Sequence, residues 1–168
     1  MELFEKLRNE GYEVATFAAG SFWIAEDIFR RVRGVVGTAV GYMGGELDYP
    51  TYEEVSVGDT GHFEVVQIVY DPKVVPYEKL LELFWELHNP TVPDEKGEKI
   101  TGQYGSVIFY HNDEQKSLAT LSKRDIERSG KFKKDIITEI RPAARFFRAK
   151  EYHQQYFEKT ASGGEIIK

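Results

Sequence analysis

The sequence predicts an α+β protein, a two-layer αβ sandwich with a ferredoxin-like (split βαβ) core and a C-terminal extension. Short runs rich in β-branched and aromatic residues alternate along the chain with segments of helical periodicity. The elements follow in the order β-α-β, β-α-β and then α-β-α, with two crossovers around paired strands, which is the split βαβ layout. With 168 residues, of which 41% are hydrophobic and 14% aromatic, the chain can bury one core, so we expect a single domain over residues 1–168.

The first βαβ unit opens with a buried strand. Residues 12–20 mix β-branched and aromatic side chains and end at a glycine, which indicates a strand followed by a tight turn. Ser21 then stands near the N-cap of a helix over residues 22–34, whose apolar side chains share one face and which ends at Gly34. Residues 35–45 predict a second strand, and their glycines suggest close backbone approach or bulges.

A polar loop over residues 48–62 leads into the second unit. Residues 63–72 are apolar on both faces, which is typical of a central strand. Residues 76–90 begin with proline at the first helical position, carry leucines and a phenylalanine at helical spacing, and stop at a second proline. A long polar loop without periodicity, residues 91–105, precedes a strand at residues 106–111.

Three elements are expected beyond the core. Residues 112–130 predict a capped amphipathic helix, residues 136–142 a short strand and residues 149–160 a last helix. The polar stretch YHQQYFEK within that helix indicates a packing and hydrogen-bonding element.

Composition excludes several classes of protein. The net charge is −6, and the basic residues are scattered among the acidic ones, so we expect no nucleic-acid partner. No window holds the roughly 18 consecutive apolar residues of a membrane span, and the N-terminus lacks the order of a signal peptide. We therefore expect a soluble, cytoplasmic protein without a membrane partner. Cysteine is absent, which excludes disulfides, thiolate metal sites and a thiol nucleophile in the chain as it stands.

Ser21 is the first candidate site residue. It lies where the backbone N–H groups and the positive end of a helix dipole stabilise an ionised group. The alternative is a plain N-cap serine, worth about 1 kcal/mol, which the turn considered alone favours. Phe22 and Trp23 follow it, and they are core side chains by default or else the floor of an apolar pocket.

Glu64 and Tyr104 each allow two interpretations. Glu64 lies inside an otherwise apolar strand, where a buried carboxyl group would have a raised pKa and could donate a proton. An edge strand with Glu64 in solvent is the alternative. Tyr104 lies between glycines on a loop that enters a strand, so it is either a core tyrosine or a phenol donor aimed into a cleft.

Other motifs are incomplete. No G-x-S-x-G elbow surrounds Ser21 and no base for acyl transfer is evident near it. His62 and Glu64 have the H-x-E spacing of zinc deaminases, but the P-C-x-x-C partner is missing. The glycine-rich stretch forms neither a P-loop nor a dinucleotide fingerprint. We therefore expect no metal and no bound cofactor.

The chain resembles the peptide methionine sulfoxide reductase A family. The resemblance rests on the segments GSFWIAEDIF, GVVGTAVGYMGG, PTYEEVSVGDTGHFEVVQIVYDP, LLELFWELHNPT, GQYGSVIFYHNDEQ, TEI and YHQQYFEK, and it extends from residue 13 to residue 160. It implies reduction of methionine S-sulfoxide, both in proteins and as the free amino acid, through a cysteine sulfenic acid. The family's catalytic cysteine falls on Ser21.

The resemblance also implies roles for the remaining candidates. Phe22 and Trp23 would hold the S-methyl group of the substrate. Glu64 would donate a proton to the sulfoxide oxygen, and Tyr52 and Tyr104 would hydrogen-bond that oxygen. Expected partners are oxidised proteins or peptides, free methionine sulfoxide, and thioredoxin or a small thiol as reductant.

Serine in place of cysteine is the main departure from the family pattern. A hydroxyl group is too weakly acidic for the reaction, so we expect the chain to bind sulfoxide without reducing it. An engineered cysteine-to-serine change is favoured because the rest of the pocket is retained, and a natural, non-catalytic sulfoxide-binding module is the alternative. Ser56 stands where some members carry cysteine, Lys99 where many carry an acidic residue, and Ile24 where glycine is common.

Overall fold

A computed structural model describes residues 2–58, 60–91 and 104–160 of the chain. Six strands form one sheet in the order β5-β4-β1-β3-β2-β6. Their bounds are β1 Glu13–Ala19, β2 Val35–Met43, β3 Phe63–Tyr70, β4 Ser106–Tyr110, β5 Glu139–Pro142 and β6 Phe147–Arg148. Neighbouring strands are antiparallel, except that β4 and β5 are parallel.

The order of the strands confirms the predicted ferredoxin-like core. Because β3 is antiparallel to both β1 and β2, the latter two run in the same direction with β3 between them. Strands β3 and β4 are likewise separated by β1. Each crossover therefore spans an inserted strand, which defines the split βαβ arrangement.

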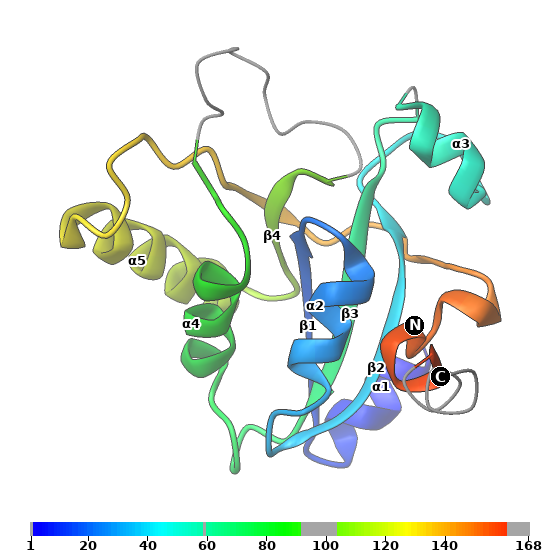
Figure 1. The fold of residues 1–168 in the computed structure, drawn as a ribbon. Helices are drawn as coiled ribbons and strands as arrows, with labels where there is room; N and C mark the ends of the chain where they lie inside the picture. The colour runs from blue at the N-terminus through cyan, green and yellow to red at the C-terminus, as the bar shows by residue number, and fades with distance from the viewer. Residues whose placement is uncertain (1, 59, 92–103, 161–168) are drawn as a thin grey trace.

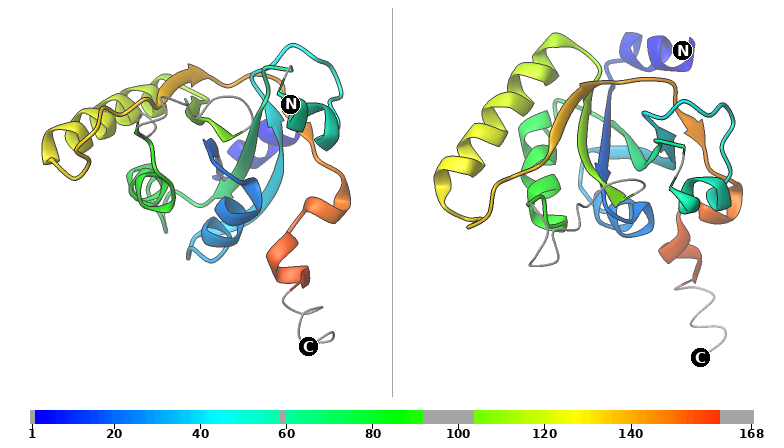
Figure 2. Two further views of the ribbon diagram at one scale, coloured as in Figure 1. Left: turned by 45° about the horizontal axis from the view of Figure 1, so that its top comes forward. Right: turned by 90° about the horizontal axis from the view of Figure 1, so that it is seen from above.

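The helices occupy the crossovers and the ends of the chain. Helices α2 and α4 lie on the same side of the sheet, and α5 packs beside α4 (Figures 1 and 2). The bounds are α1 Glu2–Asn9, α2 Phe22–Phe29, α3 Tyr52–Val57, α4 Tyr77–Leu87 and α5 Asp113–Ser129.

The main core lies between the sheet and these two crossover helices. Phe17 of β1 is fully buried, and its ring stacks on Phe29 of α2 at 5.4 Å and approaches Phe84 of α4 at 5.3 Å between centroids. A smaller apolar cluster that includes Met43 and Phe109 packs on the other face. Strand β3 is thus buried on both faces, as its apolar pattern predicts.

Several predicted elements differ in extent from the structure. The strand predicted over residues 136–142 forms only as β5, from Glu139 to Pro142. The loop predicted over residues 48–62 contains α3, which begins at a capping box formed by Thr51 and Glu54. The T-x-x-E spacing is a known signal for this motif and could have identified the helix. Helix α2 ends at Phe29 rather than at Gly34, whose φ of +102° and tight packing against Val75 belong to the turn before β2.

The helix predicted over residues 149–160 is wrong in its first half. A 3₁₀ turn, η2, spans Glu151–His153, Gln155 takes a φ of +48°, and only residues 156–160 are helical. The side-chain amides of Gln154 and Gln155 bond to β2 and α2 instead of facing solvent, and this requires an interrupted helix. Helix α1 and strand β6 were not predicted.

Candidate functional site

The turn between β1 and α2 places Ser21 at the start of a helix. Gly20 has a φ of +80°, a conformation that favours glycine, and it turns the chain out of the sheet. Ser21 occupies the N-cap in an extended conformation, and its hydroxyl makes no capping hydrogen bond. The interpretation of Ser21 as a plain N-cap serine is therefore wrong, because its side chain does not make the hydrogen bond by which such a serine stabilises a helix.

Glu64 lies directly against this turn. Its side chain belongs to the interior strand β3, the residue is 2% exposed, and Oε1 accepts a hydrogen bond of 3.1 Å from the backbone N–H of Phe22. The solvent-exposed edge position is therefore excluded. Since that N–H belongs to the peptide bond between Ser21 and Phe22, the carboxyl group and the serine are immediate neighbours.

Aromatic rings from three parts of the chain surround the same helix end. The indole of Trp23 stacks on Tyr156 with a centroid distance of 3.9 Å and an interplanar angle of 10°. Tyr52, at the start of α3, lies 6.1 Å from Trp23 and 6.4 Å from Phe22 in near-parallel orientations. His153 lies 4.7 Å from the ring of Tyr52. These rings form an apolar wall beside Ser21 and Glu64.

A hydrogen bond holds the indole in that wall. Nε1 of Trp23 donates to Nδ1 of His153 at 3.1 Å. Burial lowers the pKa of His153, which favours the neutral ring, and with Nδ1 as the acceptor the ring proton lies on Nε2. The sequence did not single out His153 as a site residue, although it lies in the quoted YHQQYFEK segment.

The C-terminal extension is anchored by polar side chains next to this wall. Gln154 is fully buried, and its side chain bonds to both the N–H and the C=O of Val40 in β2. Glu26 of α2 is 1% exposed and accepts bonds of 2.7 Å from the backbone N–H of Gln155, from its amide, and from the hydroxyl of Thr38. A buried carboxylate thus receives three donors and joins α2, β2 and the extension.

Tyr104 approaches the site through the sheet. It is 45% exposed, so the core interpretation is wrong. It precedes β4, whose Ser106 pairs with Ala19 at the end of β1 where the turn to Ser21 begins. Tyr104 and Ser21 therefore lie beside the same end of the paired strands β1 and β4.

The remaining candidates lie elsewhere or have structural contacts. Nδ1 of His62 accepts from the N–H of Gly45 at 3.0 Å, and its other ring nitrogen lies 2.7 Å from the backbone oxygen of Leu47, so the ring braces the loop after β2. Ser56 donates to the backbone oxygen of Tyr52, and Ile24 is 48% exposed. Lys99 lies outside the described residues.

The described residues contain no group of three histidine, aspartate or glutamate side chains that could hold a metal ion. Among the helices that the structure describes, none is long and apolar enough to cross a membrane.

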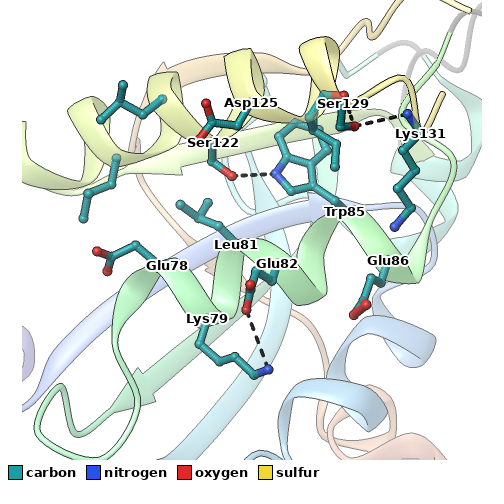
Figure 3. Close-up of a pocket in the computed structure, with 13 residues that line it drawn as sticks. Glu78, Lys79, Leu81, Glu82, Trp85, Glu86, Ser122, Asp125, Ser129 and Lys131 are labelled. Atoms are coloured by element: carbon teal, nitrogen blue, oxygen red, sulfur yellow. Dashed lines mark hydrogen bonds and ion pairs between the residues drawn. The ribbon is translucent and has the colours of Figure 1, made fainter. Parts of the chain in front are cut away.

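A groove of about 670 Å³ lies away from this site, between α4 and α5 (Figure 3). Trp85 reaches across it and donates from Nε1 to the hydroxyl of Ser122 at 2.8 Å. The ion pair between Lys79 and Glu82, at 3.6 Å, lies along α4. The groove contains none of the candidate residues, and its contacts are those of one helix packing on another.

Comparison with known proteins defines the class. A family model described as "Peptide methionine sulfoxide reductase" matches residues 13–167. The chain belongs to this family, for which reduction of methionine sulfoxide is the supported activity.

Its relatives are of the A type. The peptide methionine sulfoxide reductase MsrA of Methanosarcina acetivorans is 54% identical over 94% of this chain and 84% of its own length. Among solved structures, Mxr1 from Saccharomyces cerevisiae in reduced form is 30% identical, with a TM-score of 0.78 over 90% of this chain and 87% of that chain. Mxr1 has also been solved in complex with Trx2, with 27% identity, a TM-score of 0.59, and coverage of 88% of this chain and 86% of that chain.

Proposed function

We propose that this chain binds methionine S-sulfoxide at the N-terminus of α2, and that the form with cysteine in place of Ser21 reduces it. One observation carries the proposal. The backbone N–H of Phe22, in the peptide group that joins it to Ser21, donates a hydrogen bond to the buried carboxyl group of Glu64. An attacking group at position 21 and a proton donor at position 64 therefore lie next to the same peptide group. Membership of the reductase family supports the same assignment.

The residues around Ser21 suit the two ends of a methyl sulfoxide. The rings of Phe22 and Trp23 present apolar surface for the S-methyl group, and Tyr52 adjoins both of them. Glu64 offers a carboxyl group whose burial favours the protonated form, and it would donate to the sulfoxide oxygen. The phenols of Tyr52 and Tyr104 would hydrogen-bond that oxygen as negative charge develops on it.

Cysteine at position 21 would carry the reaction. The dipole of α2 favours its thiolate, which attacks the sulfoxide sulfur while the oxygen takes a proton from Glu64. Oxygen transfer to the cysteine sulfur then releases methionine and leaves a sulfenic acid. The two electrons come from the cysteine, so the sulfoxide is reduced as the thiol is oxidised.

Serine cannot replace the thiol in this step. Its hydroxyl is poorly acidic at neutral pH, and acceptance of the oxygen would form an O–O bond in a hydroperoxide instead of a sulfenic acid. The chain with Ser21 is therefore proposed to bind the substrate and to remain inactive.

Regeneration requires an external thiol. The sequence contains no cysteine, so no second thiol of the chain could form a disulfide with the sulfenic acid. One thiol of thioredoxin, or a small thiol, would attack it and release water, and a second thiol would restore the cysteine. The complex of yeast Mxr1 with Trx2 supports thioredoxin as the partner. A dithiol reductant agrees with a cytoplasmic location, which we propose together with oxidised proteins, peptides and free methionine sulfoxide as substrates.

Turnover of separated epimers tests the proposal. We expect Ser21→Cys to reduce the S epimer of an N-blocked methionine sulfoxide with dithiothreitol, to leave the R epimer unreacted, and the Ser21 chain to reduce neither. Ser21→Ala is the matched control, because it removes the hydroxyl without adding a thiol.

A binding measurement beside this assay decides between a reductase and a non-catalytic sulfoxide-binding module. Binding of the S epimer by both forms, without turnover by the cysteine form, would favour a natural sulfoxide-binding module over a reductase. Equal reduction of both epimers would contradict an A-type site.

A further inference from the structure

Tyr42 of β2 carries a buried hydroxyl group that the assigned roles do not use. The residue is 1% exposed, and its hydroxyl has no hydrogen-bond partner among the described residues. Buried polar groups are nearly always hydrogen-bonded, because leaving one unpaired costs stability. An unpaired hydroxyl in a well-packed interior therefore calls for an explanation.

Its position links the hydroxyl to the proposed site. Tyr42 is the direct cross-strand partner of Glu64 in the antiparallel pair of β2 and β3, so both side chains stand on the same face of the sheet. Its ring lies 5.7 Å from the ring of Phe22, between centroids. The tyrosine thus forms part of the floor on which the start of α2 rests.

The phenol of Tyr42 lies near side chains that surround the start of α2. Burial raises the pKa of Tyr42, and negative charge on the neighbouring Glu64, Tyr152, Tyr52 or Glu53 would raise it further. These neighbours come from β3, α3 and η2, the elements that surround the start of α2. Together with the pairing to Glu64 and the contact with Phe22, this places the phenol beside the site, and it stays protonated as a hydrogen-bond donor.

A second unpaired donor lies on the same ring of Phe22. Nε2 of His153 is buried without a partner among the described residues, and the imidazole lies 5.5 Å from Phe22. Because Nδ1 accepts from Trp23, Nε2 is the nitrogen that carries the proton. Both donors, one on β2 and one on η2, lie near the ring of Phe22, and neither has an acceptor among the described residues, so an oxygen held there would satisfy them.

We propose that the hydroxyl of Tyr42 is a further functional group of this site, and that it donates a hydrogen bond to an acceptor oxygen held beside Glu64. That oxygen is the sulfoxide oxygen of the substrate, or a water molecule that bridges to the carboxyl group. The inference rests on the proposed function and adds a specificity-determining residue to it.

Tyr77 provides a matched control. Its hydroxyl is also buried and without a partner among the described residues, but it packs in the core, 6.0 Å from Phe17 and 6.5 Å from Tyr70 between ring centroids. Tyr42→Phe and Tyr77→Phe each remove one unpaired hydroxyl and keep the ring, so neither should lower the thermal stability of the chain.

Binding to the Ser21 chain tests the sulfoxide arm. We expect Tyr42→Phe to weaken the binding of N-acetyl-methionine S-sulfoxide methylamide about tenfold, the effect of one neutral hydrogen bond. Affinity for the corresponding sulfide, which lacks the oxygen, should not change. Tyr77→Phe should leave both affinities unchanged. Isothermal titration calorimetry measures all of them.

Turnover tests the water arm. If the water bridge is correct, Tyr42→Phe in the Ser21→Cys background keeps its sulfoxide affinity but shifts the acidic limb of the pH profile, because Glu64 has lost a bonded neighbour.

Two outcomes would overturn the inference, and a third would overturn the proposed function on which it rests. Unchanged affinity together with an unchanged pH profile would leave the hydroxyl merely unpaired. Equal losses for sulfoxide and sulfide would indicate packing alone. Failure of the Ser21 chain to bind sulfoxide, with no turnover by the cysteine form, would instead overturn the proposed function itself.

Discussion

Glu64 combines two functions that a single substitution can separate. Its Oε1 accepts the N–H of Phe22, which positions the start of α2, while the protonated carboxyl group is proposed to donate to the substrate. Glutamine keeps a carbonyl oxygen for the first bond but has no acidic proton for the second. A residue that serves as both anchor and acid is therefore best tested with the amide.

We expect Glu64→Gln in the Ser21→Cys background to lower kcat/KM for the S epimer by about a hundredfold or more, the usual contribution of a general acid. The free energy of unfolding should change little. Glu82→Gln, an exposed glutamate on α4, is the control and should have full activity. Unaltered turnover by Glu64→Gln would exclude the carboxyl group as the proton donor.

At the scale of elements, the C-terminal extension, residues 147–160, is attached to β2 and α2. Strand β6 pairs antiparallel with β2 at Gly41, where an added Cβ would clash with the backbone oxygen of Phe147, so the close approach requires glycine. Beyond β6, Gln154 and Gln155 bond to β2 and α2 and bring the following Tyr156 onto Trp23. The wall of the site is thus partly built by residues far along the chain.

Gln154→Ala should weaken the attachment of the C-terminal extension to β2. It removes bonds to the N–H and C=O of Val40 and to the C=O of Ala149, all in a fully buried position. We expect a loss of about 2–3 kcal/mol in the free energy of unfolding, because buried backbone groups lose their partners. Urea denaturation measures it, with the exposed Glu127→Ala as the control. A loss below 0.5 kcal/mol, the usual range for surface changes, would contradict the anchoring role.

At the scale of the whole molecule, two half-buried, neutral histidines join separate elements. His88, after α4, lies 2.7 Å from the hydroxyl of Ser106 in β4, and His111, after β4, lies 2.8 Å from that of Thr16 in β1. The pKa of each ring is lowered from 6.5 to about 4, chiefly by burial and, for His111, also by the nearby charge of Arg8. Their neutral forms are therefore part of the native structure.

This makes stability dependent on pH in a defined direction. Both pKa values are lower in the folded chain than in the unfolded chain. The free energy of unfolding is therefore highest above pH 6.5. It falls as the pH drops toward 4, because in this range the unfolded chain binds protons and the native chain does not. We expect up to about 3 kcal/mol for each histidine. Urea denaturation from pH 7 to pH 4 should show a smaller decline for His88→Gln than for the parent. Parallel curves would show that His88 titrates normally in the native state.

Local sequence patterns were sufficient to predict most elements of the core and the turn that carries Ser21. The periodicity of residues 63–72 identified a strand apolar on both faces, and the isolated carboxylate within it marked Glu64 as unusual before its contacts were known. The glycine before Ser21 and the helical period after it located the turn. These features depend on neighbours in sequence, which is why they can be recognised without a fold.

The sequence by itself determined the family, the order of the strands and helices in the core, and the turn at Ser21. Only the tertiary structure decided that the hydroxyl of Ser21 does not cap its helix, that Glu64 reaches the N–H of Phe22, and that the buried hydroxyl of Tyr42 has no partner in the part of the chain that the structure describes. It also decided that the predicted last helix is interrupted so that Gln154 can bond to β2. The physical reason is that hydrogen-bond partners and burial depend on segments far apart in the chain, whereas periodicity and turn chemistry are local.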